Sequence, residues 1–383
     1  MTKHIAFVAP FGLGQKTTVW ARTLPLAKQL VAHGHQVVII IPPWDTPADS
    51  GRTWTEDGVA LVNVRLNGGL PFVVGRLIAA LNHFAPDIVH IVKPRAHAGI
   101  VQWLLWQRRK LIRNGPQIFL DVDDWEQAWA TINDYPWLVA RFLAWQEEWG
   151  IRHADGITAA SHWLVDWVKQ YSPASPVCYL PHGVTAPPAT KPQPAVASQQ
   201  ILFYSRYVEV SPGWLAEFWA ALHEAEPAAT LVVFGDAFQP ARPALFQVAM
   251  TARDPGAAAR VSWQPYDQKR VESIYATSGC VIFPSDQTPL HEAKCSVRLA
   301  TTLLRGIPVV ASAVGEQQYY GAEGAAALVP AAATPAAFAA AVVQVLRDPE
   351  TRKLAQQQAR ARILRDYDPV QLGSELARTY SVL

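Results

Sequence analysis

Cysteine is scarce in this chain, with Cys178, Cys280 and Cys295 the only three among 383 residues. Three scattered thiols are too few for a disulfide framework or a cysteine metal site, and they are typical of a reducing cytoplasm. An excess of one charge is also lacking, because 33 Lys and Arg stand against 31 Asp and Glu. The net charge of +2 excludes the strongly basic character of a nucleic-acid-binding protein, so no nucleic-acid partner is expected.

Long apolar runs are missing as well. No stretch of eighteen or more apolar residues occurs, so the sequence predicts no membrane-spanning helix. The apolar run within residues 1–10 is too short for a signal peptide and predicts a first buried strand. Tryptophan and proline, in contrast, are abundant, and many of the 15 Trp lie between Trp103 and Trp167.

Apolar segments alternate between strand-like runs and helical periodicity along the whole chain. In the first half, strands are expected at residues 5–8, 37–41, 59–64, 87–92, 117–122, 156–159 and 177–180, and helices at 19–32, 72–84, 99–113, 138–151 and 161–170. In the second half, strands are expected at 201–204, 230–234, 261–263, 280–283, 309–311 and 327–329. This alternation predicts parallel sheets that are covered by helices on both faces.

The composition changes between the two series, where residues 185–200 form a proline-rich linker. The sequence therefore predicts an α/β protein with two doubly wound, Rossmann-like domains, residues 1–184 and 201–365. A terminal helix over 366–383 is expected to pack back on the first domain. Ligands of such domains bind at the carboxyl ends of strands, and two facing domains predict a cleft between them.

Gly12-Leu13-Gly14 forms a glycine loop between the first strand and the first helix. As a dinucleotide fingerprint it is weak, because Thr17 occupies the place of the third glycine. It also fails as a P-loop, since Gln15-Lys16-Thr17-Thr18 only mimics the Gly-Lys-Thr ending. A plain tight turn remains an alternative interpretation.

The strand expected at 117–122 ends in Asp121-Val122-Asp123-Asp124. Paired carboxylates at this spacing hold divalent cations in some nucleotide-sugar enzymes, because hard cations prefer carboxylate oxygens. A solvated strand end that carries a helix N-cap explains the same residues without a metal.

A cationic turn opens a short amphipathic helix between Lys294 and Gly306. Helix N-termini near cations bind phosphate, because free N–H groups and the helix dipole both favour negative charge. Gly306 permits a left-handed C-cap, and Pro308 leads into an apolar strand. An ordinary helix–loop–strand unit without any phosphate site remains an alternative.

The order of residue types in this stretch resembles the C-terminal-domain signature of the family 4 glycosyltransferases of GT-B fold, bacterial type. The matching residues are Lys294, Arg298, Leu299, Gly306, Pro308, Val309 and Val310. Thr301 departs, because the family has a glutamate there that holds the ribose hydroxyls of the donor, and Ser296 replaces a usual proline. The resemblance runs from the Gly12 loop to the Gly315 loop and implies a GT-B fold.

This resemblance implies a site for a nucleotide-diphosphate sugar. Ser205-Arg206 stand where the family has Gly-Arg, and an arginine there grips the diphosphate with its planar fork. The family lysine five residues later is replaced by Ser211. The other donor-binding positions implied by the match are Gly12, Gly14, Lys294, Arg298, Thr301, Gly315 and Glu316.

The implied reaction moves a sugar from a UDP- or GDP-linked donor to an acceptor hydroxyl, with retention and without a metal or other cofactor. Asp123, Arg206 and Lys294 are the expected catalytic residues, with the cations stabilising the leaving diphosphate. Asp123 stands where the family usually has histidine, although Asp123-Asp124-Trp125-Glu126 resembles one bacterial branch. A sugar or lipid-linked sugar in cell-surface glycan or glycolipid synthesis is the expected acceptor.

Residues 103–113 combine an apolar face with a basic end. They predict either an interfacial helix that contacts anionic membrane, which places the protein at the inner face, or an ordinary Rossmann helix with basic residues in its last turn. The departures at Thr301, Ser211 and Asp123 leave open a catalytically impaired GT-B homologue that binds a nucleotide or glycan. A nicotinamide oxidoreductase is disfavoured by the incomplete glycine fingerprint.

Overall fold

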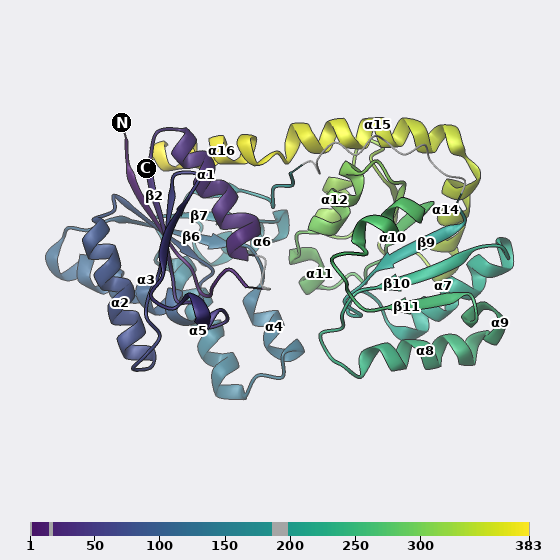
Figure 1. Cartoon of the computed structure of the whole chain (residues 1–383), viewed down its shortest axis with the longest axis horizontal. Coiled ribbons are helices and arrows are strands. Elements are labelled where there is room, and N and C mark those ends of the chain that lie inside the picture. The colour runs from purple at the N-terminus through teal and green to yellow at the C-terminus, as the bar shows by residue number, and fades with distance from the viewer. Residues whose placement is uncertain (1, 15–17, 186–197, 383) are drawn as a thin grey trace. The chain divides into compact units, whose positions relative to one another are not determined.

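The computed structural model describes residues 2–14, 18–185 and 198–382, which fold into two compact units (Figure 1). Unit 1 comprises residues 1–183, 293–295 and 367–383, and unit 2 comprises 184–292 and 296–366. Most of the predicted linker at 185–200 lies outside the described residues, as do Gln15, Lys16 and Thr17. Within these ranges, no helix has both the length and the apolarity that a membrane span requires.

Unit 1 is built on an eight-stranded sheet. Its strands are β1 (His4–Val8), β2 (Gln36–Ile41), β3 (Thr53–Glu56), β4 (Val59–Asn63), β5 (Ile88–Val92), β6 (Gln117–Val122), β7 (Gly156–Ala159) and β8 (Val177–Tyr179). Its helical elements are η1 (Thr18–Thr23), α1 (Leu24–Ala32), η2 (Pro47–Asp49), α2 (Leu70–Phe84), α3 (Ala96–Ile112), α4 (Glu126–Ile132), α5 (Trp137–Arg152), α6 (His162–Tyr171) and α16 (Pro369–Val382).

The strand order of unit 1 is β3-β4-β2-β1-β5-β6-β7-β8, and all neighbours are parallel except β3 with β4. Without the outer strands β3 and β8, this is the doubly wound order 3-2-1-4-5-6. The central strands are buried along their whole length, because apolar side chains on both faces pack under helices. The predicted doubly wound sheet of the first half is confirmed.

Unit 2 contains a six-stranded sheet of order β11-β10-β9-β12-β13-β14, which is parallel throughout and again of the doubly wound type. The strands are β9 (Gln200–Tyr204), β10 (Thr230–Phe234), β11 (Val261–Gln264), β12 (Cys280–Phe283), β13 (Val309–Ser312) and β14 (Ala327–Val329). The helices are α7 (Pro212–Ala225), α8 (Arg242–Arg253), α9 (Pro255–Ala258), α10 (Val271–Thr277), α11 (Pro289–Ala293), α12 (Val297–Leu304), α13 (Glu316–Tyr320), α14 (Pro335–Arg347) and α15 (Pro349–Asp366).

Three local features of unit 1 differ from the sequence prediction. The structure contains strand β3 and helix α4, neither of which was predicted. Asp57-Gly58, which follows β3, forms a hairpin turn with positive φ at both residues, and this dipeptide is a typical hairpin signal. The helix predicted over 19–32 opens as the π-helical turn η1, and regular α-helix begins only at Leu24. Pro25 explains this break, because its missing N–H cannot continue the hydrogen bonding of a preceding α-helix.

Helix α16 completes the core of unit 1, although it is formed from the last residues of the chain. Figure 1 shows it beside α1, against which it packs. Its side chains Leu372, Leu376 and Tyr380 are buried with the apolar residues on one face of the sheet. The Tyr380 hydroxyl forms a hydrogen bond with Nδ1 of His90, a buried residue of β5.

Candidate active site

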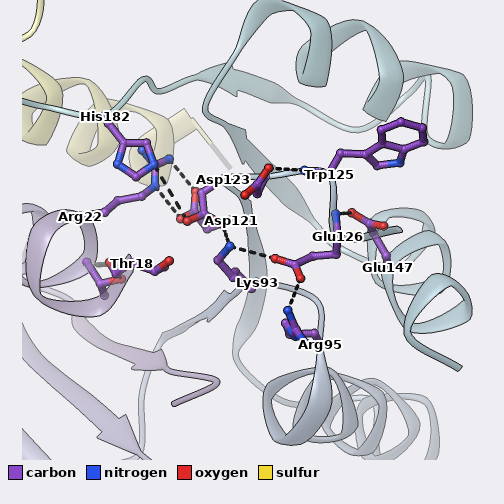
Figure 2. A network of polar contacts seen from close by, with 12 residues as sticks. Thr18, Arg22, Lys93, Arg95, Asp121, Asp123, Trp125, Glu126, Glu147 and His182 are labelled. Atoms are coloured by element: carbon purple, nitrogen blue, oxygen red, sulfur yellow. Dashed lines mark hydrogen bonds and ion pairs between the residues drawn. The ribbon is translucent and has the colours of Figure 1, made fainter. Parts of the chain in front are cut away.

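The carboxyl ends of β5 and β6 bring together a buried cluster of charged side chains (Figure 2). Lys93 follows β5 and Asp123 follows β6, and neither is more than 8% exposed. Lys93 Nζ lies 3.0 Å from Asp123 Oδ1 and donates to Glu126 Oε1 at 2.8 Å. One ammonium group is therefore shared by two carboxylates.

Glu126 ties this cluster to the first turn of α4. Its second oxygen accepts from Arg95 at 2.5 Å, and its backbone N–H donates to Glu147 of α5 at 3.0 Å. The other Glu147 oxygen accepts from the backbone N–H of Gln127. Glu147 thus satisfies two free N–H groups at the start of α4, which fixes the helix against the charged cluster.

A second ion pair lies beside the first. Arg22 of η1 binds Asp121 through two hydrogen bonds of 2.8 and 2.7 Å, and Thr158 donates to the same carboxylate at 2.7 Å. The Arg22 guanidinium also donates to the carbonyl oxygens of Leu180 and Pro181. These contacts attach the segment after β8 to η1, the helical turn that follows the glycine loop.

The buried groups have shifted pKa values. Burial raises the pKa of Asp123 to about 6, against the opposing effect of Lys93. Burial also tends to raise the pKa of Asp121, but the Arg22 guanidinium outweighs it and holds that pKa well below its usual range. His182 Nε2 lies 4.0 Å from Asp123 Oδ2, and burial together with the charge of Arg22 lowers the His182 pKa to about 3. His182 is therefore neutral at physiological pH.

Two of the three aspartates at the end of β6 are thus matched by cations of the protein itself. Arg22 binds Asp121, Lys93 binds Asp123, and Asp124 accepts a hydrogen bond from the backbone N–H of Trp125. Among the residues placed by the structure, no three His, Cys, Asp or Glu side chains come together as metal ligands. The contacts shown are those of an organised ion-pair network.

The glycine loop packs tightly against the turn that follows β2. The Gly12 N–H donates to Asp45 Oδ1 at 2.5 Å, and a Cβ atom at Gly12 would lie 2.2 Å from Thr46 Oγ1. A Cβ atom at Gly14 would lie 2.9 Å from Asp45 Oδ2. Both glycines are needed for this close approach.

Lys294 belongs to unit 1, with the short segment 293–295. Its Nζ lies 5.4 Å from the centre of the Trp129 ring of α4. The neighbouring Cys295 accepts a hydrogen bond from the backbone N–H of His182 at 3.3 Å. These contacts place the segment beside α4 and the charged cluster of unit 1.

Two arginines come together in unit 2, at the carboxyl end of β9 and the first turn of α12. The Arg298 guanidinium lies 4.2 Å from the centre of the Tyr204 ring and donates to the Tyr204 carbonyl. Arg206 lies 4.9 Å from the centre of the Phe238 ring. Burial and the neighbouring charge of Arg298 lower the pKa of Arg206. In the described chain neither guanidinium forms an ion pair with a carboxylate, so this pair favours an anion.

The turn after β9 is held by Glu209. Its carboxylate accepts hydrogen bonds from the hydroxyl of Ser205 and from the backbone N–H groups of Arg206 and Val208. Glu209 therefore fixes the backbone that carries Arg206. Ser211 caps α7, because its hydroxyl accepts from the Trp214 N–H at 3.1 Å.

The remaining donor positions of the sequence prediction also lie in unit 2. The Thr301 hydroxyl donates to the Arg298 carbonyl within α12 at 3.0 Å. Gly315 has φ of +49°, and a Cβ atom there would lie 2.5 Å from the carbonyl oxygen of Glu292. Glu316 is buried in the first turn of α13. Arg206 and Arg298 thus lie together in one unit, while Asp123 and Lys294 belong to the other.

Most residues of the charged cluster in unit 1 were not predicted from the sequence. Arg22, Lys93, Arg95 and Glu126 were not among the predicted site residues. Two signals were available: Lys93 directly follows a mostly apolar strand, and Arg22 is the one charged residue of the segment Thr18–Thr23. A charge at such a position is buried and requires a partner.

Two family models match the chain. Residues 17–183 match the glycosyl transferase 4-like domain, and residues 198–348 match glycosyl transferases group 1. Among curated protein sequences none matches significantly.

Several solved structures have the same fold over the full length. Sucrose-phosphate synthase from Thermosynechococcus elongatus is 17% identical, with a TM-score of 0.73, and the match covers 99% of this chain and 98% of that one. HepE of Anabaena, solved in complex with UDP-glucose, is 15% identical with a TM-score of 0.68 and full coverage of both chains. A glycosyltransferase from Rickettsia africae is 16% identical with a TM-score of 0.68, over 100% of this chain and 99% of that one. All three support the two-domain GT-B fold.

Proposed function

The chain belongs to the family 4 glycosyltransferases of GT-B fold, and on this basis we propose that it transfers a sugar from a UDP- or GDP-linked donor to an acceptor hydroxyl, with retention at the anomeric carbon. The observation that carries the proposal is the pair Arg206 and Arg298 in unit 2. Two like charges held side by side repel each other, and a bound diphosphate removes that repulsion.

In the proposed reaction, the acceptor oxygen forms a bond to the anomeric carbon while the bond from that carbon to the diphosphate oxygen breaks. The hydroxyl proton passes to the leaving diphosphate. Arg206 and Arg298 bind the diphosphate and, with Lys294, stabilise the negative charge that builds on it. No step of this proposal requires a metal or an organic cofactor.

Asp123 is proposed to accept a hydrogen bond from a sugar hydroxyl. Lys93 holds its carboxylate at 3.0 Å, and the Arg22–Asp121 pair lies alongside, so its position is determined by the surrounding ion pairs. Such fixed charges need no rearrangement during the reaction, which is the basis of electrostatic preorganisation.

For the acceptor we propose a sugar or a lipid-linked sugar of a cell-surface glycan or glycolipid. HepE of Anabaena has also been solved with UDP and glucose, which shows that a protein of this fold accommodates both parts of a sugar nucleotide. The scarcity of cysteine agrees with a cytoplasmic location, and within the cytoplasm we propose the inner face of the membrane.

A catalytically impaired homologue is the second candidate function, and two contacts favour it. The Thr301 hydroxyl is used within α12, and the Ser211 hydroxyl caps α7. Neither side chain supplies the carboxylate or the cation that family members have at these positions. Such a protein would bind a nucleotide or a glycan without turnover.

The test is a thermal shift of the full chain with UDP, GDP, ADP and NAD. A ligand at about 100 times its dissociation constant stabilises by about 2.7 kcal/mol. We expect a shift with UDP or GDP that is lost in Arg298→Ala and kept in Arg253→Ala, a variant of an exposed arginine on α8 that pairs with Glu217. A shift with NAD alone would contradict the proposal.

Turnover then separates the two candidates. Release of UDP or GDP from the sugar nucleotide in the presence of acceptor supports the enzyme, and NMR of the product reports whether the anomeric configuration is retained. Addition of EDTA tests the proposed metal independence. If the protein binds the sugar nucleotide but releases no UDP or GDP with any acceptor tested, the impaired homologue is favoured.

A further inference from the structure

Helix α5 is longer than the strands that it accompanies. Glu147, its eleventh residue, already contacts the first turn of α4, directly beyond the end of β6. Ten residues of α5 therefore precede that level, and at 1.5 Å per residue they extend about 15 Å past the sheet edge. This part of the helix has no sheet to cover.

The projecting part of α5 is nevertheless apolar on its outside. Trp137 and Leu138 are each 72% exposed, Phe142 is 43% exposed and Trp145 is 47% exposed. Soluble monomers rarely leave large apolar side chains in one continuous patch, and such patches mark interaction sites.

Helix α3 extends this apolar surface. Trp106 of α3 packs edge-on against Trp149 of α5 at 5.4 Å between ring centroids, and Trp103 is 37% exposed one turn earlier. Along α5 itself the rings of Phe142, Trp145 and Trp149 follow one another at 5.8 and 6.2 Å. We call this surface the α3–α5 face, which consists of Trp103, Trp106, Trp137, Leu138, Phe142 and Trp145.

The charges around the α3–α5 face are mostly positive. Helix α3 contains three basic residues and no acidic one, and Lys110 lies 4.0 Å over the Trp106 ring. The basic side chains on the two helices and the residue after α3 are Arg108, Arg109, Lys110, Arg113, Arg141 and Arg152. The acidic side chains in the same region that reach solvent are Asp134, Glu148 and Asp155.

We propose that the α3–α5 face is a docking surface for anionic phospholipid membrane. Tryptophan and phenylalanine beside Arg and Lys are the side chains enriched at the membrane–water interface. The net positive charge of the region complements anionic headgroups, which attract each nearby Lys or Arg.

The surface differs from the interfacial helix predicted over residues 103–113. The main apolar face of helix α3 packs against the core of unit 1, where Val101 and Leu105 are buried. Most of the exposed aromatic surface is supplied by α5. Residues 103–113 contribute Trp103, Trp106 and the basic rim of the proposed contact.

The orientation of α5 connects this surface to the charged cluster. Because β6 and β7 are parallel, α5 begins beyond the carboxyl edge of the sheet and ends near its amino edge. Asp123 and Lys93 lie at the same carboxyl edge as Trp137 and Leu138. The Trp137 end of the α3–α5 face therefore lies at the end of unit 1 that carries these residues.

Vesicle sedimentation of the full chain, without donor or acceptor, tests the proposal. We expect binding to phosphatidylcholine vesicles that contain phosphatidylglycerol, weaker binding to pure phosphatidylcholine, and loss of binding at high salt. The double variant Phe142→Ser with Trp145→Ser should weaken binding by about tenfold or more. The double variant Lys110→Glu with Arg113→Glu should weaken it by about 25-fold or more, because the loss of each cation contributes about fivefold.

The matched control is Leu245→Ser with Val248→Ser, which removes two exposed apolar side chains from α8 of unit 2 and should leave binding unchanged. Equal melting temperatures for all variants establish that each is folded. No binding at low salt would overturn the proposal, as would binding that the α5 variant leaves intact. Conversion of a dimer to a monomer by the α5 variant would assign the face to a second copy instead. The measurement uses no sugar nucleotide, so its failure and that of the proposed function are distinguishable.

Discussion

The Lys93 ammonium lies 3.0 Å from the Asp123 carboxylate, and the two residues follow neighbouring parallel strands. Lys93 has φ of +62°, in the left-handed region that side chains other than glycine rarely adopt. The backbone is thus bent where the side chain turns towards the two carboxylates. Strain of this kind persists where the surroundings impose it, often at functional sites.

Replacement of Lys93 by methionine should destabilise unit 1 by about 3–5 kcal/mol, because it removes one partner of a buried ion pair. Urea denaturation followed by circular dichroism measures the loss. Adding Asp123→Asn to this variant should restore part of the stability, since the uncompensated charge is then gone. Strictly additive effects of the two substitutions would show that the pair is not coupled.

Activity should depend on the ionisation of Asp123, whose pKa burial raises to about 6. If the carboxylate accepts a hydrogen bond from substrate, kcat/KM should fall about tenfold per pH unit below pH 6. The contribution of Asp123 to stability has the opposite sign: it is fully present below its unfolded pKa of about 3.9 and is lost as the pH rises through 6. Asp123→Asn should be less active and should lack this acidic limb; an unchanged limb would exclude Asp123 as its origin.

Two buried histidines should make the protein sensitive to acid. Burial lowers the pKa of His90 to about 4 and that of His182 to about 3, whereas an unfolded histidine titrates near 6.5. Their stabilisation is fully present above pH 6.5 and is lost as the pH falls through 4 and 3, at up to about 1.4 kcal/mol per pH unit for each histidine. Unfolding free energies at pH 7, 6 and 5 should therefore decline, and His182→Asn should decline less steeply. Parallel curves for the two proteins would contradict the assignment to His182.

Alanine at Gly315 should destabilise unit 2 by about 1–3 kcal/mol, since the residue has positive φ and its Cβ would collide with the Glu292 backbone. Gly213→Ala is the matched control, because its Cβ would meet only Ser211 Oγ at 4.0 Å inside helix α7. That substitution should be neutral or slightly stabilising. Similar melting temperatures for the two variants would show that the turn before α13 relaxes readily.

Arg206→Lys should weaken UDP or GDP binding by about tenfold, or about 1.4 kcal/mol, because lysine keeps the charge but loses the planar fork that binds two phosphate oxygens. Titration calorimetry measures this effect. Arg253→Lys on α8 is the control and should bind as the wild type does. An affinity unchanged in Arg206→Lys would remove Arg206 from the diphosphate contact.

The sequence predicted the central strands of both sheets well, because buried parallel strands are largely continuous apolar runs, as at residues 37–41. It missed β3 and α4, which have only four and seven residues and so lack a strong periodic signal. The ion pairs of unit 1 could not be predicted from the sequence for another reason. Arg22 and Asp121 are 99 residues apart in sequence, and a local sequence pattern does not indicate which distant residue a charged side chain pairs with.

In unit 2 the site residues were predicted from the sequence, but the contacts of some of them were not. Arg206 and Arg298 were identified through motifs, and in the structure Arg298 donates to the carbonyl of Tyr204, two residues before Arg206. The roles of Ser211 and Thr301 could not be predicted from the sequence, because each hydroxyl forms a hydrogen bond with one of several backbone groups nearby. Such local hydrogen bonds compete with any role in ligand binding.

Helix α16 also bears on how the protein is made. Its side chains Leu372, Leu376 and Tyr380 complete one face of the sheet whose strands come from residues 4–179. During translation, the N-terminal sheet must therefore wait with that face uncovered while about two hundred further residues are synthesised, which takes on the order of ten seconds or more at typical elongation rates. Chaperones bind exposed apolar surface of this kind. We therefore expect the protein to be most prone to aggregate during translation, after the strands of unit 1 have been synthesised and before α16 has been.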